Sequence, residues 1–73
     1  EERFSEARRH YVRALALRPG HAPWWMGLGI CLEAENDPSR ALEAYRQALQ
    51  EAGLDTPSRE FVTARVRALE NRQ

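Results

Sequence analysis

The sequence predicts an all-α protein built from about four antiparallel helices. Apolar residues recur at spacings of three and four along most of the chain, and no segment alternates apolar and polar residues as a strand would. Proline and glycine interrupt the helical pattern at intervals and leave connections of only a few residues. Such short connections force neighbouring helices to run antiparallel.

Local signals place the ends of these helices. The predicted helices cover approximately residues 3–18, 23–35, 38–52 and 57–71. The fourth carries an apolar stripe made of Phe61, Val62, Val66 and Leu69. Asp37 precedes Pro38 as an N-cap precedes a proline in the first turn, where the missing N–H costs nothing. Thr56 and Pro57 form the same pair before the fourth helix, and we expect Gly53 to close the third in a left-handed conformation.

An internal repeat organises the chain. Shifting the sequence by 34 residues aligns identical residues, and most of these identities fall in one stretch. The clustered pairs are Ser5 with Ser39, Ala7 with Ala41, Tyr11 with Tyr45, Ala14 with Ala48 and Leu15 with Leu49. Chance would scatter matches along the chain, so the clustering indicates a repeated helical unit.

The spacing of large and small residues carries a family resemblance. The residues concerned are Ala7, Tyr11, Ala14, Pro19, Trp25, Leu28, Gly29, Leu32, Ala41, Tyr45 and Ala48. This pattern resembles the tetratricopeptide repeat (TPR), a helix-turn-helix unit of about 34 residues. Leu32 replaces the usual Tyr, and Gly53 stands where Pro is common. The resemblance implies an antiparallel TPR solenoid fragment, with Gly29 and Ala41 placed where two helix backbones approach closely.

In the TPR register the chain divides into three parts. Residues 1–21 match the second helix of an incomplete TPR, residues 22–55 a complete TPR, and residues 56–73 a C-terminal capping helix. The first helix therefore lacks the partner that would cover Tyr11 and its apolar neighbours. We expect that cover from a helix preceding Glu1 or from a second copy of the chain in a dimer.

A narrower resemblance concerns residues 22–30, 40–49 and 59–62. These segments are similar to the C-terminal TPR region of mannose-sensitive haemagglutinin (MSHA) type IV pilus biogenesis proteins. That resemblance implies a bacterial protein anchored in the inner membrane, whose repeats face the periplasm and bind other pilus-assembly components. Without it, the expected compartment is the cytoplasm.

Composition argues against several other functions. Eleven Lys and Arg balance eleven Asp and Glu, so the chain lacks the positive field that attracts nucleic acids and anionic membranes. No apolar run is long enough to insert into a bilayer. One cysteine and two histidines do not supply the usual zinc spacings. We therefore expect no nucleic-acid partner, no membrane insertion of this segment, and no metal or cofactor.

The residues that could carry catalysis have structural explanations. Cys31 lies on the apolar second helix, where we expect a buried thiol with a raised pKa rather than a nucleophile. His10 and His21 are expected at the surface. The carboxylates in residues 33–37 could form a metal or acid–base site, but a solvated charged turn explains them better. The sequence therefore predicts that the chain is not an enzyme.

One candidate binding surface is the groove that TPR resemblance places along the second and fourth helices. Its predicted lining is Met26, Ile30, Glu33, Ala34, Glu60, Ala64 and Arg67. TPR domains that grip a C-terminal carboxylate carry Lys and Asn at such positions, and this chain has Met26 and Ile30 instead. An apolar strip of this kind suits an amphipathic helix or an extended peptide. The competing interpretation is that Met26 and Ile30 only contact a missing preceding helix.

A second candidate surface is basic. Residues 8–21 contain four Arg, two His and no acid, whereas residues 33–55 contain six acids and two Arg. Arg8, Arg9 and Arg13 could dock an acidic surface of a partner or of a neighbouring copy. The alternative is that both charged regions are ordinary solvated helix faces.

Together these observations predict a noncatalytic protein–protein interaction module. It would serve as an adaptor or scaffold, within a pilus-assembly or secretion complex if the narrower resemblance holds. The alternative is a structural module, either an inner slice of a longer TPR solenoid or a unit that self-associates through its uncovered first helix. Concentration-dependent size would indicate self-association, and capture of a foreign peptide would indicate an adaptor.

Overall fold

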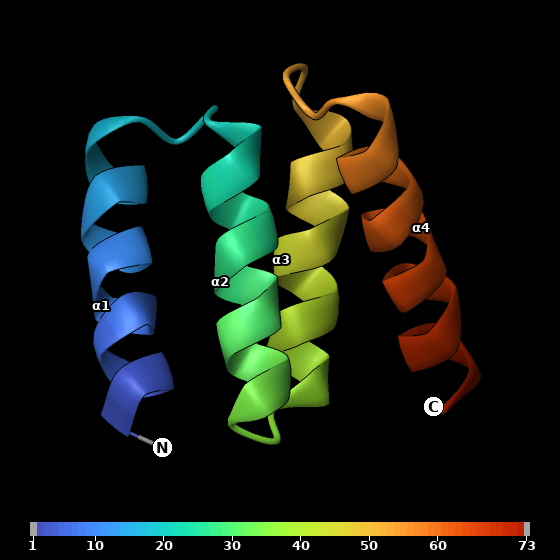
Figure 1. Ribbon diagram of the computed structural model, residues 1–73, viewed down its shortest axis with the longest axis horizontal. Helices are drawn as coiled ribbons and strands as arrows, with labels where there is room; N and C mark the ends of the chain where they lie inside the picture. The colour runs from blue at the N-terminus through green and yellow to red at the C-terminus, as the bar shows by residue number, and fades with distance from the viewer. Residues whose placement is uncertain (1, 73) are drawn as a thin grey trace.

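The computed structural model describes residues 2–72 and shows four helices in that range (Figure 1). Helix α1 spans Glu2–Leu17, α2 spans Ala22–Ala34, α3 spans Pro38–Gln50 and α4 spans Thr56–Asn71. None of these described residues lies in a strand, so the predicted all-α class is confirmed. Glu1, the first residue of the first predicted segment, and Gln73, the last residue of the last one, lie outside the described residues.

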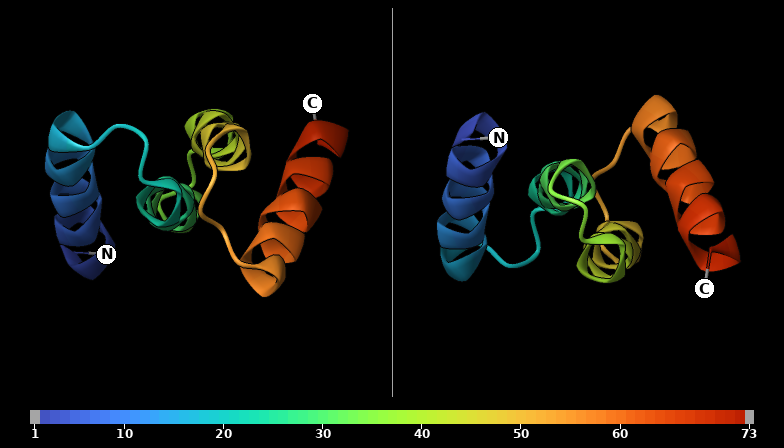
Figure 2. Two further views of the ribbon diagram at one scale, coloured as in Figure 1. Left: turned by 90° about the horizontal axis from the view of Figure 1, so that it is seen from above. Right: turned by 90° about the horizontal axis from the view of Figure 1, so that it is seen from below.

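The helices pack in chain order, each against its neighbours, and form a zigzag when seen along their axes (Figure 2). Helices α2 and α3 lie side by side in the middle, with α1 beside α2 and α4 beside α3. Seen along the helix axes, α2 and α3 are displaced towards opposite sides of the row of four helices (Figure 2). The fold therefore presents two opposite faces.

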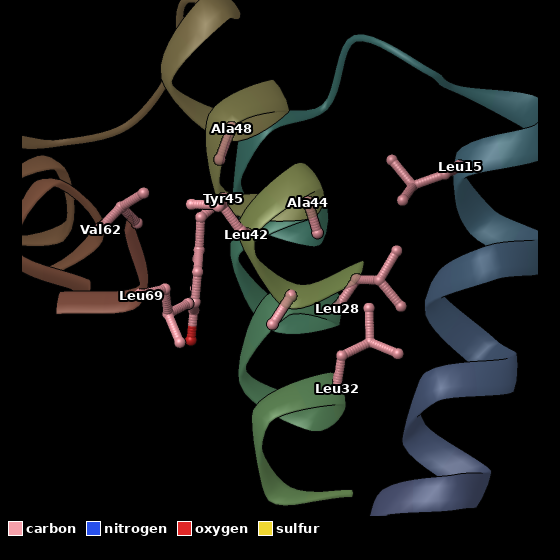
Figure 3. Packing of buried hydrophobic residues seen from close by; sticks show 10 residues of the cluster. Leu15, Leu28, Leu32, Leu42, Ala44, Tyr45, Ala48, Val62 and Leu69 are labelled. Atoms are coloured by element: carbon pink, nitrogen blue, oxygen red, sulfur yellow. The ribbon is translucent and has the colours of Figure 1, made fainter. Parts of the chain in front are cut away.

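Two groups of buried side chains hold the outer helices (Figure 3). Leucines fill the space between α1 and the central pair, whereas Tyr45 faces two aliphatic side chains of α4. The members are Leu15, Leu28 and Leu32 on the first side and Tyr45, Val62 and Leu69 on the second. Ala41, Ala44 and Ala48 are small and at most 3% exposed, which lets α2 and α3 approach closely.

Glycines in α2 make room for two tyrosine rings. A Cβ atom on Gly29 would lie 2.6 Å from the ring of Tyr45, and one on Gly27 would lie 2.3 Å from the ring of Tyr11. Real Cβ atoms do not approach other atoms so closely, so a larger residue would force a ring to move. The sequence analysis expected a close backbone approach at Gly29. The atoms nearest to a Cβ at this position belong to the ring of Tyr45, so the close contact is between the α2 backbone and a side chain of α3.

The predicted end of α3 and the predicted start of α4 are wrong. Helix α3 ends at Gln50, because the chain becomes extended immediately afterwards, and Gly53 (φ 125°) lies beyond the end without capping it. The N-cap of α4 is Asp55, whose carboxylate accepts a hydrogen bond of 2.9 Å from the backbone N–H of Ser58. Thr56 is the first helical residue instead. A charged carboxylate is a stronger acceptor for an N-terminal N–H than a hydroxyl is.

The turn between α2 and α3 is closed on both sides. Asn36 adopts a left-handed conformation (φ 61°) and donates its N–H to the carbonyl of Glu33 at 3.0 Å. The N–H of Asp37 reaches the carbonyl of Leu32 at 2.9 Å, which completes a Schellman motif. The Asp37 carboxylate then accepts a bond of 3.2 Å from the N–H of Arg40. The predicted N-cap of the third helix is therefore confirmed.

The two glycines allow a matched test of ring packing. We expect Gly29→Ala to lower the free energy of unfolding by about 1–3 kcal/mol, because Tyr45 is completely buried and its ring has no space to move into. Gly27→Ala should be nearly neutral. Tyr11 is only half-buried and can swing outward, and alanine gains about 1 kcal/mol of helix propensity over glycine. Urea unfolding followed by circular dichroism measures both, and equal losses would contradict the explanation.

Candidate functional site

A charged network joins α2, α3 and α4. The carboxylate of Glu33 accepts two hydrogen bonds from the guanidinium of Arg65, one of them from Nε at 2.9 Å and the other from a terminal nitrogen. The hydroxyl of Tyr45 donates to the same carboxylate at 2.9 Å. One side chain from each helix thus converges on a single point, and the bidentate geometry restricts how α4 can sit on the central pair.

The pKa shifts in this network follow from its hydrogen bonds and its partial burial. The hydrogen bond from Arg65 is the main reason that the pKa of Glu33 lies below its usual value, although partial burial opposes the shift. Burial, followed by the hydrogen bond to Glu33, raises the pKa of Tyr45. The ion pair therefore stays charged and the phenol stays protonated at neutral pH. Neither Glu33 nor Tyr45 is suited to exchange a proton at neutral pH.

A second polar link ties α1 to the end of α2. Ser5 and Arg8 each donate a hydrogen bond of 2.6 Å to the carboxylate of Glu35, one to each oxygen. The hydrogen bond from Ser5 is the main reason that the pKa of Glu35 is lowered, and the bond from Arg8 lowers it further. Arg8 is therefore engaged within the chain. Of the predicted basic surface, Arg9 and Arg13 are exposed.

The predicted groove residues of α2 differ in their exposure and contacts. Ile30 is 39% exposed and Met26 is half-buried, one turn away on the same helix. Glu33 belongs to the network described above, so its charge is satisfied by Arg65. The remaining predicted residues, Ala34, Glu60, Ala64 and Arg67, are all exposed.

Two residues of α4 that face the central pair were not among the predicted groove residues. Phe61 was expected in the core, but it is 42% exposed and touches the ring of Tyr45 edge-on, with ring centroids 6.2 Å apart. Arg65 lies one turn later and binds Glu33. The sequence signal for this ion pair is that Glu33 and Arg65 are 32 residues apart, which is close to the repeat length of 34 and so places them at similar levels of two equivalent helices.

A groove with a volume of about 550 Å³ lies between α1, α2 and α3. Its floor is formed by Trp25, Leu28 and Leu32 of α2, and Val12 and Ala44 contribute apolar walls from α1 and α3. Val12 is 51% exposed. The sequence analysis did not find this groove, because its walls come from three helices whose relative positions the sequence pattern does not specify.

Comparison with known proteins decides the family. The family described as Tetratricopeptide repeat matches residues 1–56, more than half of the chain. The chain belongs to the tetratricopeptide repeat family. No curated protein and no solved structure is significantly similar to it. TPR units generally mediate protein–protein interactions and are typically noncatalytic.

The remaining chemical groups of the TPR chain are distributed as follows. Cys31 is 4% exposed with a free thiol whose pKa is raised, chiefly by burial, so its predicted burial is confirmed. His10 is exposed, whereas His21 is half-buried and packs against Trp24 with ring centroids 4.0 Å apart. Within residues 2–72, no helix has both the length and the apolar character needed to cross a membrane.

We expect acid to weaken the TPR fold partly through Glu33. Because its folded-state pKa is lowered, its stabilising effect is complete above the ordinary value of 4.5 and is lost as pH falls through the folded-state value. Arg65→Gln should lower the free energy of unfolding by about 1 kcal/mol at neutral pH, since both side chains are partly exposed. The difference between parent and variant should then shrink as the pH falls below the ordinary pKa.

Urea unfolding at a series of pH values measures this difference. Arg67→Gln is the matched control, because it removes an exposed guanidinium from the same helix. It should leave the pH profile of stability unchanged. A gap between parent and Arg65→Gln that stays constant as the pH is lowered would show that Glu33 is not stabilised by Arg65.

Proposed function

We propose that this TPR chain is a noncatalytic protein-binding module that acts as an adaptor or scaffold. The observation that carries the proposal is a pair of large apolar side chains, Ile30 and Phe61, each about two-fifths exposed. Ile30 precedes Glu33 by about one turn, and Phe61 precedes Arg65 by one turn. Glu33 binds Arg65, and α2 and α4 run in the same direction (Figure 1). The two apolar side chains therefore lie at a similar level on neighbouring helices.

We call this face the α2–α4 surface, made of Met26, Ile30, Glu33 and Ala34 with Glu60, Phe61, Ala64 and Arg67. Its apolar strip suits an amphipathic helix or an extended peptide with one or two large apolar anchors. The Glu33–Arg65 pair beside the strip is already hydrogen-bonded. Burying it under a ligand would leave no unpaired charge, which avoids the largest penalty of desolvation. Exposed Glu60 and Arg67 at the rim offer charges of both signs for specificity.

Selection of a displayed random-peptide library on the folded chain tests this function. We expect recovered peptides to carry large apolar residues and to lose binding to Ile30→Glu, because a charge would stand in the middle of the strip. Helix content should remain, since Ile30 is exposed. Arg9→Glu, on exposed α1, is the control that should retain binding. Peptides that still bind Ile30→Glu would exclude the α2–α4 surface, and unfolding of this variant would show that Ile30 serves packing.

The resemblance of residues 22–30, 40–49 and 59–62 to MSHA pilus biogenesis proteins favours a pilus-assembly component as the partner. Under this proposal the module faces the periplasm and the partner belongs to the same inner-membrane assembly. The assignment is supported by the sequence resemblance alone. The peptides selected above should then match segments of such components, and peptides unrelated to them would count against it.

Self-association through α1 is the competing function. Ala7, Tyr11 and Ala14 are partly exposed, whereas their counterparts 34 residues later, Ala41, Tyr45 and Ala48, are completely buried against α2. In a head-to-tail assembly, a second copy would cover α1 with its α4, the counterpart of α2. Thr63 would then face Tyr11 as Gly29 faces Tyr45. A Cβ atom on Gly29 would already lie 2.6 Å from the ring of Tyr45, so the larger Thr63 would collide with a Tyr11 ring in the equivalent position. This clash favours an adaptor over head-to-tail self-assembly.

Sedimentation velocity distinguishes the two functions. We expect the parent chain to give one species whose sedimentation coefficient does not change with concentration. Thr63→Gly removes the clash and is the informative comparison, because its association would show that Thr63 alone blocks the contact. A parent chain that associates as its concentration rises would contradict the adaptor proposal in its simple form.

A further inference from the structure

Helix α4 carries half of the α2–α4 surface and is inclined to the two central helices. Seen along the axes of α2 and α3, α4 runs obliquely (Figure 2). We infer that the Glu33–Arg65 ion pair is a positioning device, which fixes the rotation of α4 so that Phe61 and Ile30 face the same ligand. The inference rests on the proposed function, since it concerns the surface on which a peptide would bind. The pair would act through Phe61 rather than by contacting the ligand.

The apolar contacts of α4 are directed towards α3. Val62 and Leu69 are at most 1% exposed and lie beside the ring of Tyr45 (Figure 3). These two residues are seven positions apart, close to two helical turns, so they form a narrow stripe along α4. Hydrophobic burial has no preferred direction. A narrow apolar stripe therefore resists separation of α4 from α3 more than it resists rotation of α4 about its own axis.

Directional contacts are needed to fix that rotation. Arg46 of α3 donates a hydrogen bond of 2.7 Å to Glu70, but both side chains are about half-exposed. Arg59 reaches the carbonyl oxygen of Leu49 at 3.5 Å, which is long for a hydrogen bond. Both contacts tie α4 to the same helix or its end. Among the described residues, only Arg65 makes a polar side-chain contact from α4 to α2.

The ion pair and the two apolar anchors share helix faces. Arg65 and Phe61 are four residues apart, so they lie on one face of α4. Ile30 and Glu33 are three residues apart and share a face of α2 in the same way. The two hydrogen bonds from Arg65 to Glu33 require one mutual orientation of the guanidinium and the carboxylate. The rotation of α4 that satisfies this pair therefore also determines where Phe61 points.

A third side chain holds the pair in place before any ligand arrives. The hydroxyl of Tyr45 donates to Glu33 at 2.9 Å from α3, so this carboxylate is held by two helices besides its own. A surface whose anchors are already in position loses less conformational freedom when a ligand binds. Breaking the pair would let α4 sample rotations in which Phe61 points away from the ligand, and affinity would fall.

Fluorine NMR tests the position of Phe61 without a ligand. The chain contains two phenylalanines, Phe4 on α1 and Phe61 on α4, so labelling with 4-fluorophenylalanine gives one signal for each. The Phe61 signal is sensitive to the ring of Tyr45, whose centroid lies 6.2 Å away. We expect Arg65→Gln and Glu33→Gln to move the Phe61 signal in the same direction and to leave the Phe4 signal unchanged.

Binding of the tightest library peptide, carrying a fluorescent label, tests the consequence for the surface. Arg65→Gln, Glu33→Gln and the double variant should weaken binding by the same factor, about threefold or more, because each removes one shared ion pair. Direct contacts of the two side chains with the peptide would instead give losses that add. Glu70→Gln is the matched control, since it removes the ion pair between α3 and α4. It should leave the Phe61 signal in place and binding within about twofold of the parent.

The outcomes separate this inference from the proposed function. The inference is overturned if the Phe61 signal is the same in the parent and both single variants, if Glu70→Gln moves it equally, or if the binding losses add. Loss of helix content in Arg65→Gln, followed by circular dichroism, would also overturn it. If no peptide is recovered, the proposed function fails, whereas the Phe61 signal still decides the positioning role. If peptides bind but neither signal nor affinity depends on the pair, only the positioning role fails.

Discussion

The ring of Tyr45 occupies the position on which the arrangement of α2, α3 and α4 depends. It is completely buried, packs on the bare backbone of Gly29 and meets Phe61 edge-on. Its hydroxyl reaches Glu33, and that carboxylate also holds Arg65 of α4. One side chain of α3 thus combines apolar burial with the polar contact that orients α4. Because these interactions share atoms, altering one of them disturbs the others.

This arrangement decides which surfaces remain for partners. The carboxylates of Glu33 and Glu35 are satisfied by hydrogen bonds within the chain, so the charged groups that link the helices are not free to recruit a ligand. The exposed apolar side chains are different, since Ile30 of α2, Phe61 of α4 and Val12 of α1 all contact solvent. Apolar contacts, rather than the paired charges, are therefore the basis of the proposed binding.

Much of the fold could be predicted, because it depends on local patterns. The helical spacing of apolar residues, the Asp37–Pro38 cap and the burial of Cys31 are all confirmed. The Asn36 turn was missed, since asparagine enters the left-handed region in only some of its contexts. The α4 cap was misplaced by one residue because two adjacent residues can both cap, and their acceptor strength decided between them.

Residue periodicity and the short connections predicted the helices and their antiparallel order, and the resemblance to the TPR family was confirmed by the family match. Only the packed structure revealed that Arg65 binds Glu33, that Phe61 is exposed, and that Val12 borders a groove. These features depend on the rotation and separation of helices that are distant in sequence. For α2 and α3 they depend on how Tyr45 fits the space above Gly29, and for α1 and α2 on how Tyr11 fits beside Gly27, steric relations that no single helix pattern contains.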